Sequence, residues 1–440
     1  MSTKNIEQIY DQNLKLTAAS DGEFNPKRLI KEVKMADLRV KMGSLELENP
    51  IIISSGHLTR TGDDIKRCDK YGGGAVIIKS GFLEKEYEKV VKPYAPGLFP
   101  DARANFHSTG DGYLSICGLS PIPVEAWAKW FKENIKEIKT PVIASLMAIS
   151  VEGYIKGAKM FQEAGAEALE ILLGCPLPYL LPHPYVGGAS FNPAIVEEVC
   201  SEVRKAVDIP LGVKMMFNFL DQSPLQIPRK VGLDWLTIVI AFPSAPGIKL
   251  NEVEPVMPSS VFISGSKVAK HTNFVALLNQ RNQCQDIHVS ITGGTQNWSD
   301  IVEFIMYGAS SVQVQTLFMQ KGMGVIEEFK RNISDYMDSK GFGSIEEMKG
   351  IILPKLLTFD EAIATYGETK GKIVIAADQE KCIGCGVCEE VCNWGAIKVI
   401  DDTVDIVKEK CEGCGVCVCS CTQEALWLEN VDLIKKIARG

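Results

Sequence analysis

Short apolar and β-branched runs recur along the first 316 residues and alternate with longer segments whose apolar positions have helical spacing. Segment 124–139 is typical of the latter, because Trp127, Trp130 and Phe131 share one face of a helix. Strands that alternate with helices pair in parallel, and eight repeats of this length predict an α/β fold with a closed (β/α)8 TIM barrel. The eight runs are 51–54, 75–79, 142–147, 168–173, 211–215, 235–241, 288–292 and 311–316.

Several connections between the predicted strands are informative. The residues that follow the first strand, from Gly56 onward, lack the glycine-rich fingerprint of an open dinucleotide-binding sheet, so the barrel is preferred over that alternative. Connections 81–123 and 242–265 are far longer than ordinary linkers, and long connections at this rim of a barrel usually cover an active site. Connection 174–192 is rich in proline and glycine, which predicts a lid.

Composition excludes some classes of function. The 440 residues include 47 Lys and Arg and 55 Asp and Glu, for a net charge of −8. A nucleic-acid binder usually has a basic face, so we expect no nucleic-acid partner. No apolar run approaches the ~18 residues that span a bilayer, and residues 1–34 lack the apolar core of a signal peptide. We therefore expect a cytoplasmic protein with no membrane association.

Cysteine is distributed unevenly along the chain. Five of the 14 cysteines lie in the first 381 residues, and the other nine lie in the last 59. Eight of these nine repeat the spacing C-x2-C-x2-C-x3-C in tandem, as bacterial two-cluster ferredoxins do. Structural zinc sites, the alternative, seldom show such a repeat. The ninth, Cys419, is expected to be a spare thiol. Residues 379–428 thus resemble a ferredoxin, and electron transfer follows from that resemblance.

Two [4Fe–4S] clusters are expected, because the fourth cysteine of each motif serves the other cluster in such ferredoxins. One cluster would bind Cys382, Cys385, Cys388 and Cys421. The other would bind Cys411, Cys414, Cys417 and Cys392. Four glycines let the backbone turn close to the sulfides: Gly384, Gly386, Gly413 and Gly415. Asn393 and Thr422 replace the proline that usually follows the fourth cysteine, which removes no ligand.

The pattern predicts four segments: an N-terminal extension (1–34), a barrel (35–323), a helical segment and linker (324–372) and a small α+β ferredoxin domain (373–440). Iron–sulfur clusters carry single electrons, whereas most substrates exchange two, so the barrel is expected to hold a flavin as converter. Its phosphate needs backbone N–H groups near the last strands, which Ser264-Gly265 and 292–295 can offer. Lys79 and Lys214 each end an apolar strand and could stabilise the reduced flavin ring.

Several stretches carry a family resemblance, namely 51–55, 76–82, 142–147, 175–176, 213–215, 264–265, 292–298 and 312–316, with Lys340, Gly341, Ser344 and Glu347 beyond them. They resemble the FMN barrel of class 1 dihydroorotate dehydrogenases and dihydropyrimidine dehydrogenases. With the tail, the chain resembles the ferredoxin-bearing subunits of bacterial dihydropyrimidine dehydrogenases. The resemblance implies FMN bound by Ser54, Ser55, Gly56, Lys79, Ser80, Ser145, Lys214, Ser264, Gly265, Gly293, Gly294, Gln315 and Thr316. The two lysines would contact the flavin ring. The phosphate would be bound by Gly265, Gly294 and the turn formed by Gln315-Thr316.

The resemblance also implies a catalytic cysteine. In the family, the cysteine of an Asn-x-Ser-Cys-Pro loop is the general acid or base opposite the flavin, and here that segment ends in Gly174-Cys175-Pro176. Cys175 is therefore the candidate catalytic residue, since a thiol can protonate the carbon next to the one that receives hydride. His183 on the same loop is the reserve acid. For His57 and His107, packing is as good an explanation as catalysis.

The amide groups that clamp a pyrimidine in this family are missing. The asparagine before Ser-Cys-Pro aligns with Leu172, the Asn-Thr pair of the sixth strand aligns with Ile240-Ala241, and the asparagine of the second connection is replaced within 115–118. Apolar side chains would leave the ring's N–H and C=O groups unpaired. We therefore expect a less polar small-molecule substrate, with a C=C bond conjugated to one carbonyl or carboxylate.

The leading hypothesis is an oxidoreductase of CH–CH groups, with FMN and two [4Fe–4S] clusters, suited to anaerobic metabolism. No second nucleotide-binding fingerprint occurs, so ferredoxin or a separate NAD(P)H-oxidising flavoprotein subunit is the expected electron donor, and an oligomer is expected. One alternative is a dihydropyrimidine dehydrogenase subunit with an altered pocket. Another is an electron-transfer subunit whose barrel has lost catalysis.

Overall fold

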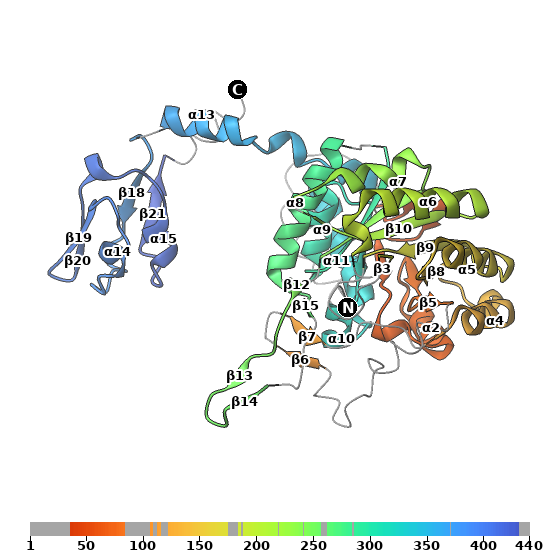
Figure 1. The fold of residues 1–440 in the computed structure, drawn as a ribbon. Coiled ribbons are helices and arrows are strands. Elements are labelled where there is room, and N and C mark those ends of the chain that lie inside the picture. Colours follow the sequence, from red (N-terminus) through yellow and green to blue (C-terminus); the bar gives the residue numbers. More distant parts are fainter. Residues whose placement is uncertain are drawn as a thin grey trace, which may run out of the picture.

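The barrel and the small C-terminal unit are both visible in the computed structural model (Figure 1). It describes residues 36–83, 106–108, 112–115, 122–174, 184–185, 188–218, 220–240, 242–256, 262–283, 286–369 and 371–430. No helix among these residues is long and apolar enough to cross a membrane.

Eight parallel strands close into a barrel, as the sequence predicted. They follow one another around the ring in chain order, and the last pairs with the first to complete it. The strands are β3 (Ile51–Ile53), β4 (Ala75–Ile77), β8 (Val142–Met147), β9 (Ala168–Leu172), β10 (Leu211–Met216), β11 (Trp235–Val239), β16 (His288–Thr292) and β17 (Ser311–Val314). A short strand β5 (Gly81–Phe82) pairs with β8. All eight predicted runs are therefore confirmed as strands of a TIM barrel.

Helices follow the strands and cover the outside of the barrel (Figure 1). In α4, Trp127 and Phe131 are buried as predicted, while the exposed Lys129 pairs with Glu133. Local signals fix where helices begin: the Ser150 hydroxyl caps α5 by accepting from the Gly153 N–H. The helices are α2 (Gly62–Cys68), α4 (Val124–Asn134), α5 (Val151–Glu163), α6 (Pro193–Ala206), α7 (Ile227–Lys230), α8 (Lys267–Gln283), α9 (Trp298–Met306), α10 (Thr316–Lys321) and α11 (Val325–Lys340).

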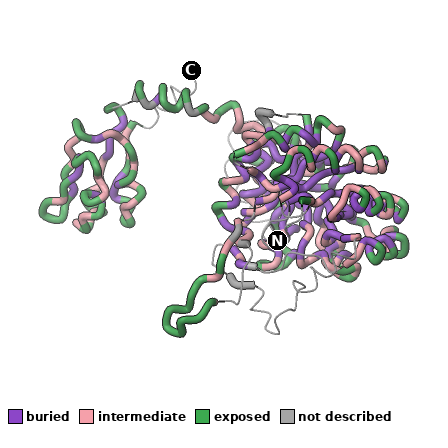
Figure 2. Tube along the Cα trace, viewed as in Figure 1, coloured by how far each residue is buried: buried purple, intermediate pink, exposed green. Residues whose placement is uncertain are grey.

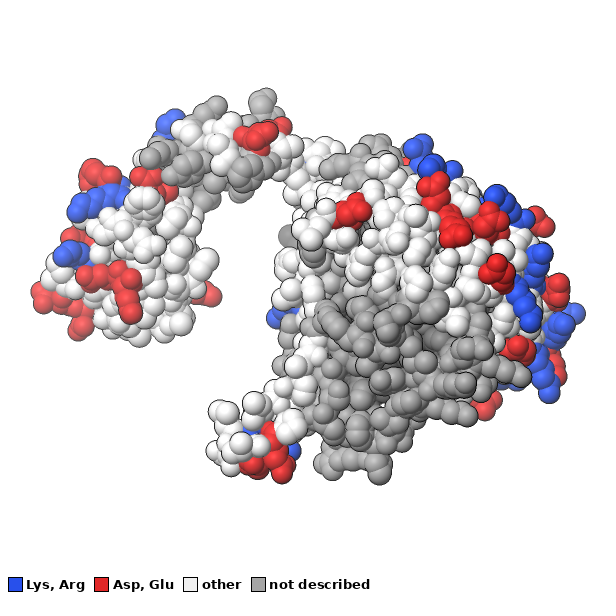
Figure 3. Space-filling view, in the orientation of Figure 1, with Lys and Arg blue, Asp and Glu red and all other residues white. Residues whose placement is uncertain are grey.

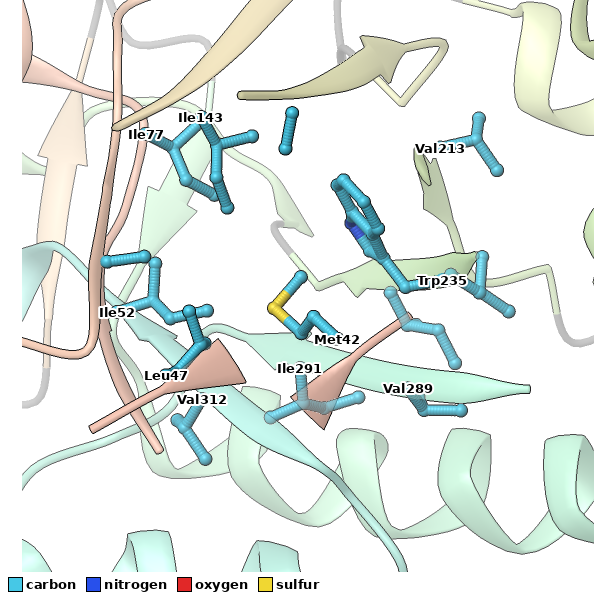
Figure 4. Packing of buried hydrophobic residues seen from close by; sticks show 14 of the residues in the cluster. Met42, Leu47, Ile52, Ile77, Ile143, Val213, Trp235, Val289, Ile291 and Val312 are labelled. Atoms are coloured by element: carbon cyan, nitrogen blue, oxygen red, sulfur yellow. The ribbon is translucent and has the colours of Figure 1, made fainter. Parts of the chain in front are cut away.

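A hairpin of β1 (Val40–Met42) and β2 (Leu45–Leu47) closes the end of the barrel at which the strands begin. Met42 is fully buried, and its sulfur accepts from the Ser311 hydroxyl at the start of β17. Figure 4 shows Met42 between Ile52 of β3 and Trp235 of β11. The indole of Trp235 fills the space that a side chain at Gly212 would need. This packed end leaves the opposite rim for the functional groups.

The two long connections come together in one antiparallel sheet above that rim. Its order is β12 (Phe242–Pro243), β15 (Phe262–Ser264), β7 (Tyr113–Ser115) and β6 (Phe106–Ser108). Ser264 of the sixth connection lies opposite Tyr113 of the second. A hairpin of β13 (Ile248–Lys249) and β14 (Glu254–Pro255) projects from the sixth connection. Of the predicted lid 174–192, residues 175–183 and 186–187 lie outside the described part.

Segment 324–372 contains helices that pack on the barrel. Ile333 and Met337 of α11 and Ile345 of α12 (Ile345–Met348) are fully buried in the same hydrophobic cluster as the barrel strands. Backbone hydrogen bonds join Asp37 to Gly343 and Ile345. The helix α13 (Phe359–Thr369) follows and leads to the C-terminal unit.

Residues 371–430 form a small unit with its own hydrophobic cluster (Figure 2). β18 (Val374–Ala377) pairs with β21 (Leu426–Glu429), and β19 (Ile397–Ile400) pairs with β20 (Thr403–Ile406). Two short helices, α14 (Val387–Glu390) and α15 (Val416–Ser420), each contain the third cysteine of a motif. Gly386 and Gly415 precede them with φ values of 75° and 78°, conformations that favour glycine.

Candidate active site

A cavity opens at the ends of the barrel strands, under the sheet made by the long connections. All thirteen residues expected to hold FMN line this cavity, although they come from seven separate stretches of the chain. The wall also includes His57, Tyr113, Leu172, Gly174, Val239, Ile240, Thr292, Thr295 and Gln313. The described part of the chain therefore assembles the predicted residues around one space.

One end of the cavity has the features of a phosphate site. Gly265, Gly293 and Gly294 have φ values of 78°, 103° and 83°. Gly293 and Gly294 are consecutive, and turns of this kind can direct backbone N–H groups towards an anion. The hydroxyl of Thr295 is buried on the cavity wall without a hydrogen-bond partner among the described residues. The Thr316 hydroxyl donates to Ser264 at 3.1 Å. A buried hydroxyl that lacks a partner beside such turns fits an absent acceptor such as the phosphate of FMN.

We expect Gly294→Ala to weaken FMN binding by about tenfold or more. A Cβ at Gly294 would lie 2.2 Å from the Lys270 backbone nitrogen, so the loop would have to move. Gly165→Ala is the matched control, because Gly165 has φ 89° but nothing within 4 Å of its Cβ. Both variants incur the cost of a left-handed conformation, about 1–2 kcal/mol. Fluorescence titration of FMN measures the difference, and equal affinities for the two variants would contradict this site.

Lys214 provides a buried basic group in the wall of the same cavity. Lys214, on β10, is only 7% exposed, and its Nζ donates to Gln313 Oε1 at 2.9 Å and to Ser54 Oγ at 3.4 Å. Burial lowers the pKa of Lys214, and the carboxylate of Glu170 opposes that shift. Lys79, directly after β4, lines the same cavity. Both lysines can thus place positive charge beside an electron-accepting ring.

His57 also lines the cavity, and its imidazole is neutral at neutral pH. Burial, and secondarily the charges of Lys79 and Arg60, lower the pKa of His57 to about 3. The amide of Gln315 holds this loop to the end of β17, accepting from the His57 and Leu58 N–H groups at 2.8 and 3.1 Å and donating to the Ser54 carbonyl at 3.0 Å. His57 is thus a polar but uncharged part of the wall.

The side of the cavity where a pyrimidine clamp was expected is apolar. Leu172 ends β9, and Val239 and Ile240 end the β11 run; all three line the cavity. Ala241 lies outside the described residues. Cys175 and His183, the candidate acids, also lie outside them, although Gly174, directly before Cys175, lines the cavity.

Two interior polar groups, Gln313 and Glu170, were not predicted from the sequence as part of the site. Gln313, in the middle of β17, contacts Lys214, and Glu170, in the middle of β9, contacts Gln313. The available signal was a polar residue within a strand whose other positions are apolar. For Glu170 that signal is strong, because a charged side chain is rarely buried without a partner.

The cysteines of the C-terminal unit group as the ferredoxin spacing predicts. Cys382, Cys385, Cys388 and Cys421 line one small cavity. Burial raises the pKa of Cys417 to about 11, and the nearby Cys414, Cys392 and Cys411 also raise it. Backbone N–H groups of Ala396 and Ala425 donate to the sulfurs of Cys392 and Cys421, each at 3.3 Å. N–H···S contacts of this kind tune iron–sulfur clusters.

Comparisons with known proteins agree with this architecture. The dihydroorotate dehydrogenase family model matches residues 37–337, and the 4Fe-4S binding domain model matches residues 375–398. The NAD-dependent dihydropyrimidine dehydrogenase subunit PreA of Escherichia coli K12 is 26% identical over 83% of this chain and 87% of its own. The dihydroorotate dehydrogenase B (NAD(+)) catalytic subunit of Methanothermobacter thermautotrophicus is 29% identical over 71% of this chain and 98% of its own. The chloroplastic dihydropyrimidine dehydrogenase (NADP(+)) of Arabidopsis thaliana is 27% identical over 76% of this chain and 80% of its own.

The family is one of FMN enzymes, and the buried Thr295 hydroxyl, the glycine turns and the two lysines of this cavity fit that cofactor. A 4Fe-4S binding domain follows the barrel. The chain therefore belongs to the dihydroorotate dehydrogenase family and is a flavin-type oxidoreductase with a C-terminal iron–sulfur domain.

Proposed function

We propose that the chain reduces, or forms, a C=C bond next to an electron-withdrawing group in a small substrate that is not a pyrimidine. The observation that carries this proposal is the apolar side of the cavity, formed by Leu172, Val239 and Ile240. Leu172 and Ile240 line it at the two positions where the resemblance expects amide side chains. An apolar side at these two positions favours a substrate whose reacting end carries a single polar group.

The residues around the proposed FMN divide the work of binding it. The turns at Gly265 and Gly294, with Thr295 and Thr316, would hold the phosphate, and Lys79 and Lys214 would lie along the ring. When bound, FMN would supply the conversion between single electrons and hydride. Ser80 and Ser145, whose hydroxyls are 2.8 Å apart, keep that part of the wall polar.

Electrons would enter through two [4Fe–4S] clusters, held by the two cysteine sets predicted from the spacing. Among the described residues, no three His, Cys, Asp or Glu side chains have the geometry to hold a single metal ion, and a four-iron cubane separates its thiolates more widely than one zinc ion does. Acidic side chains outnumber basic ones on this unit (Figure 3). That charge favours a donor, ferredoxin or a partner flavoprotein, whose docking face is basic.

We further propose Cys175 as the proton donor, with His183 as the reserve. Reduction of the C=C bond takes two electrons and two protons: one carbon accepts hydride, and the neighbouring carbon accepts the proton of the thiol. Cys175 follows Gly174, which lines the cavity on the side of Leu172. His57 is poorly suited to act as the proton donor, because its imidazole is already neutral at neutral pH.

A substrate panel tests this function. The anaerobic holoenzyme, reduced through its clusters, is given uracil, thymine and orotate, and in parallel 2-enoates and enones, and re-oxidation of the flavin is followed. We expect the best conjugated carbonyl compound to exceed every pyrimidine in kcat/KM by about a hundredfold or more, since a missing hydrogen-bond clamp costs large factors in selectivity.

A higher kcat/KM for uracil or orotate would contradict the non-pyrimidine pocket and support the alternative of a dihydropyrimidine dehydrogenase subunit. The matched variant is Leu172→Asn, which restores one amide at the clamp position. This variant should narrow the difference in kcat/KM by raising pyrimidine turnover. The control is Leu220→Asn, which should have no such effect, because Leu220 is exposed and does not line the cavity.

A further inference from the structure

Glu170 is a carboxylate enclosed in the interior of the barrel. It is fully buried in the middle of β9, and its Oε2 accepts from Thr237 Oγ1 at 2.5 Å, Gln313 Nε2 at 2.9 Å and Trp235 Nε1 at 3.3 Å. Its Oε1 has no hydrogen-bond partner among the described residues. Glu170 does not line the cavity, so it cannot contact substrate or FMN directly. A charge buried in this way destabilises the fold unless it is paired and hydrogen-bonded.

Gln313 connects Glu170 to Lys214. Its Nε2 donates to Glu170 at 2.9 Å and to Thr237 at 3.0 Å, while its Oε1 accepts from Lys214 Nζ at 2.9 Å and from Ser54 at 3.2 Å. The carboxylate thus dictates which way the amide points. If the amide turned over, its oxygen would face Glu170 and its NH2 would face the ammonium, and both contacts would be repulsive.

We propose that Glu170 is a positioning residue for Lys214: acting through Gln313, it keeps the lysine protonated and directed into the cavity. Glu170 balances the charge of Lys214 inside the barrel, and the oriented amide supplies the acceptor that fixes Nζ. This inference rests on the proposed FMN site, since it concerns the cation offered to the flavin ring.

The surroundings of Lys214 make this link testable by pH. The neighbouring strands β9 and β11 bring Glu170 and Thr237, and β17 brings Gln313; of these only Glu170 is titratable. Lys79 and His57 line the same cavity, and His57 is neutral at neutral pH. Removal of the carboxylate therefore removes the one described anion that counteracts the burial of Lys214.

The experiment measures sulfite binding to the FMN of the anaerobic full-length holoenzyme, followed by loss of flavin absorbance, between pH 6 and pH 9. Sulfite binds an oxidised flavin more tightly when positive charge lies beside its ring. After correction for the ionisation of sulfite, we expect a flat profile for the unaltered chain. In Glu170→Gln the Kd should rise by about tenfold or more across this range, as the lysine loses its proton.

Three further variants make the test specific. Glu170→Asp retains the charge, so its sulfite Kd should stay independent of pH, as in the unaltered chain. Thr237→Val removes a hydrogen bond to the same oxygen but no charge, so its profile should also stay flat. In Glu170→Gln/Lys214→Met the pH-dependent component should disappear. A Glu170→Gln profile identical to that of the unaltered chain would overturn the inference, even if the variant were less stable.

Folding of the variants provides an independent outcome. If Glu170→Gln fails to fold, the double variant should fold better than it does, because no uncompensated buried charge remains. If the stability losses of the two single variants simply add in the double variant, the link between Glu170 and Lys214 is contradicted. Failure of the unaltered chain to bind FMN would instead refute the proposed function, so the two failures are distinguishable.

Discussion

Replacement of Lys214 by methionine is expected to lower substrate-dependent turnover by about a hundredfold or more, the cost typical of removing one preorganised charge from an active site. Methionine keeps most of the aliphatic volume of lysine but removes the cation that lines the cavity. It also leaves Glu170 in the barrel interior without its opposite charge. FMN affinity and single-turnover flavin oxidation, measured on the same preparation, show whether the loss occurs in binding or in chemistry.

Lys349→Met is the matched control for this variant. The Lys349 side chain is 13% exposed and forms an ion pair with Glu346, so it is also largely buried, but it does not line the cavity. FMN binding and turnover in this variant should equal those of the unaltered chain. Equal turnover in Lys214→Met and Lys349→Met would refute the role given to Lys214.

Replacement of Cys417 by serine should nearly abolish electron transfer from reduced ferredoxin to FMN. The thiol is buried among Cys414, Cys392 and Cys411, so its loss should remove one cluster and about half of the iron. The barrel has a separate hydrophobic cluster, so its FMN content should not change. Stopped-flow reduction with ferredoxin measures the effect. A small reductant that reaches FMN directly should still reduce the FMN of this variant.

Cys419→Ser is the control, because Cys419 lies two residues away in the same helix but is exposed and belongs to neither predicted ligand set. Its iron content and its rate of FMN reduction should be unchanged. An iron loss in Cys419→Ser as large as in Cys417→Ser would show that the ligand assignment is wrong.

The sequence predicted the eight barrel strands well, because each depends on a local pattern, whereas most of the residues proposed to hold FMN came from the family resemblance. Each strand is a short apolar run, and most residues expected near FMN lie in or just after such a run; Ser264 and Gly265, at the end of the sixth connection, are the exception. In a parallel barrel the ends of all strands meet at one rim, which is why residues as distant in the chain as Ser54 and Thr316 line one cavity. The tandem cysteine motifs fixed both proposed ligand sets through spacing.

Other features could not be read from the sequence, because they depend on contacts between distant strands. The pairing of Tyr113 with Ser264 joins two long connections whose local patterns show no sign of each other. The chain from Glu170 through Gln313 to Lys214 spans three strands, and only the closure of the barrel brings them within hydrogen-bond distance. The direction of the Gln313 amide is a further consequence of that closure.

The most direct test of the central claim is a cofactor count on the anaerobically purified full-length chain. We expect one FMN with about eight irons and eight acid-labile sulfides per chain, the content of two cubane clusters. Clusters without FMN would contradict it, because the barrel would then not be a flavin site and the chain would be an electron relay.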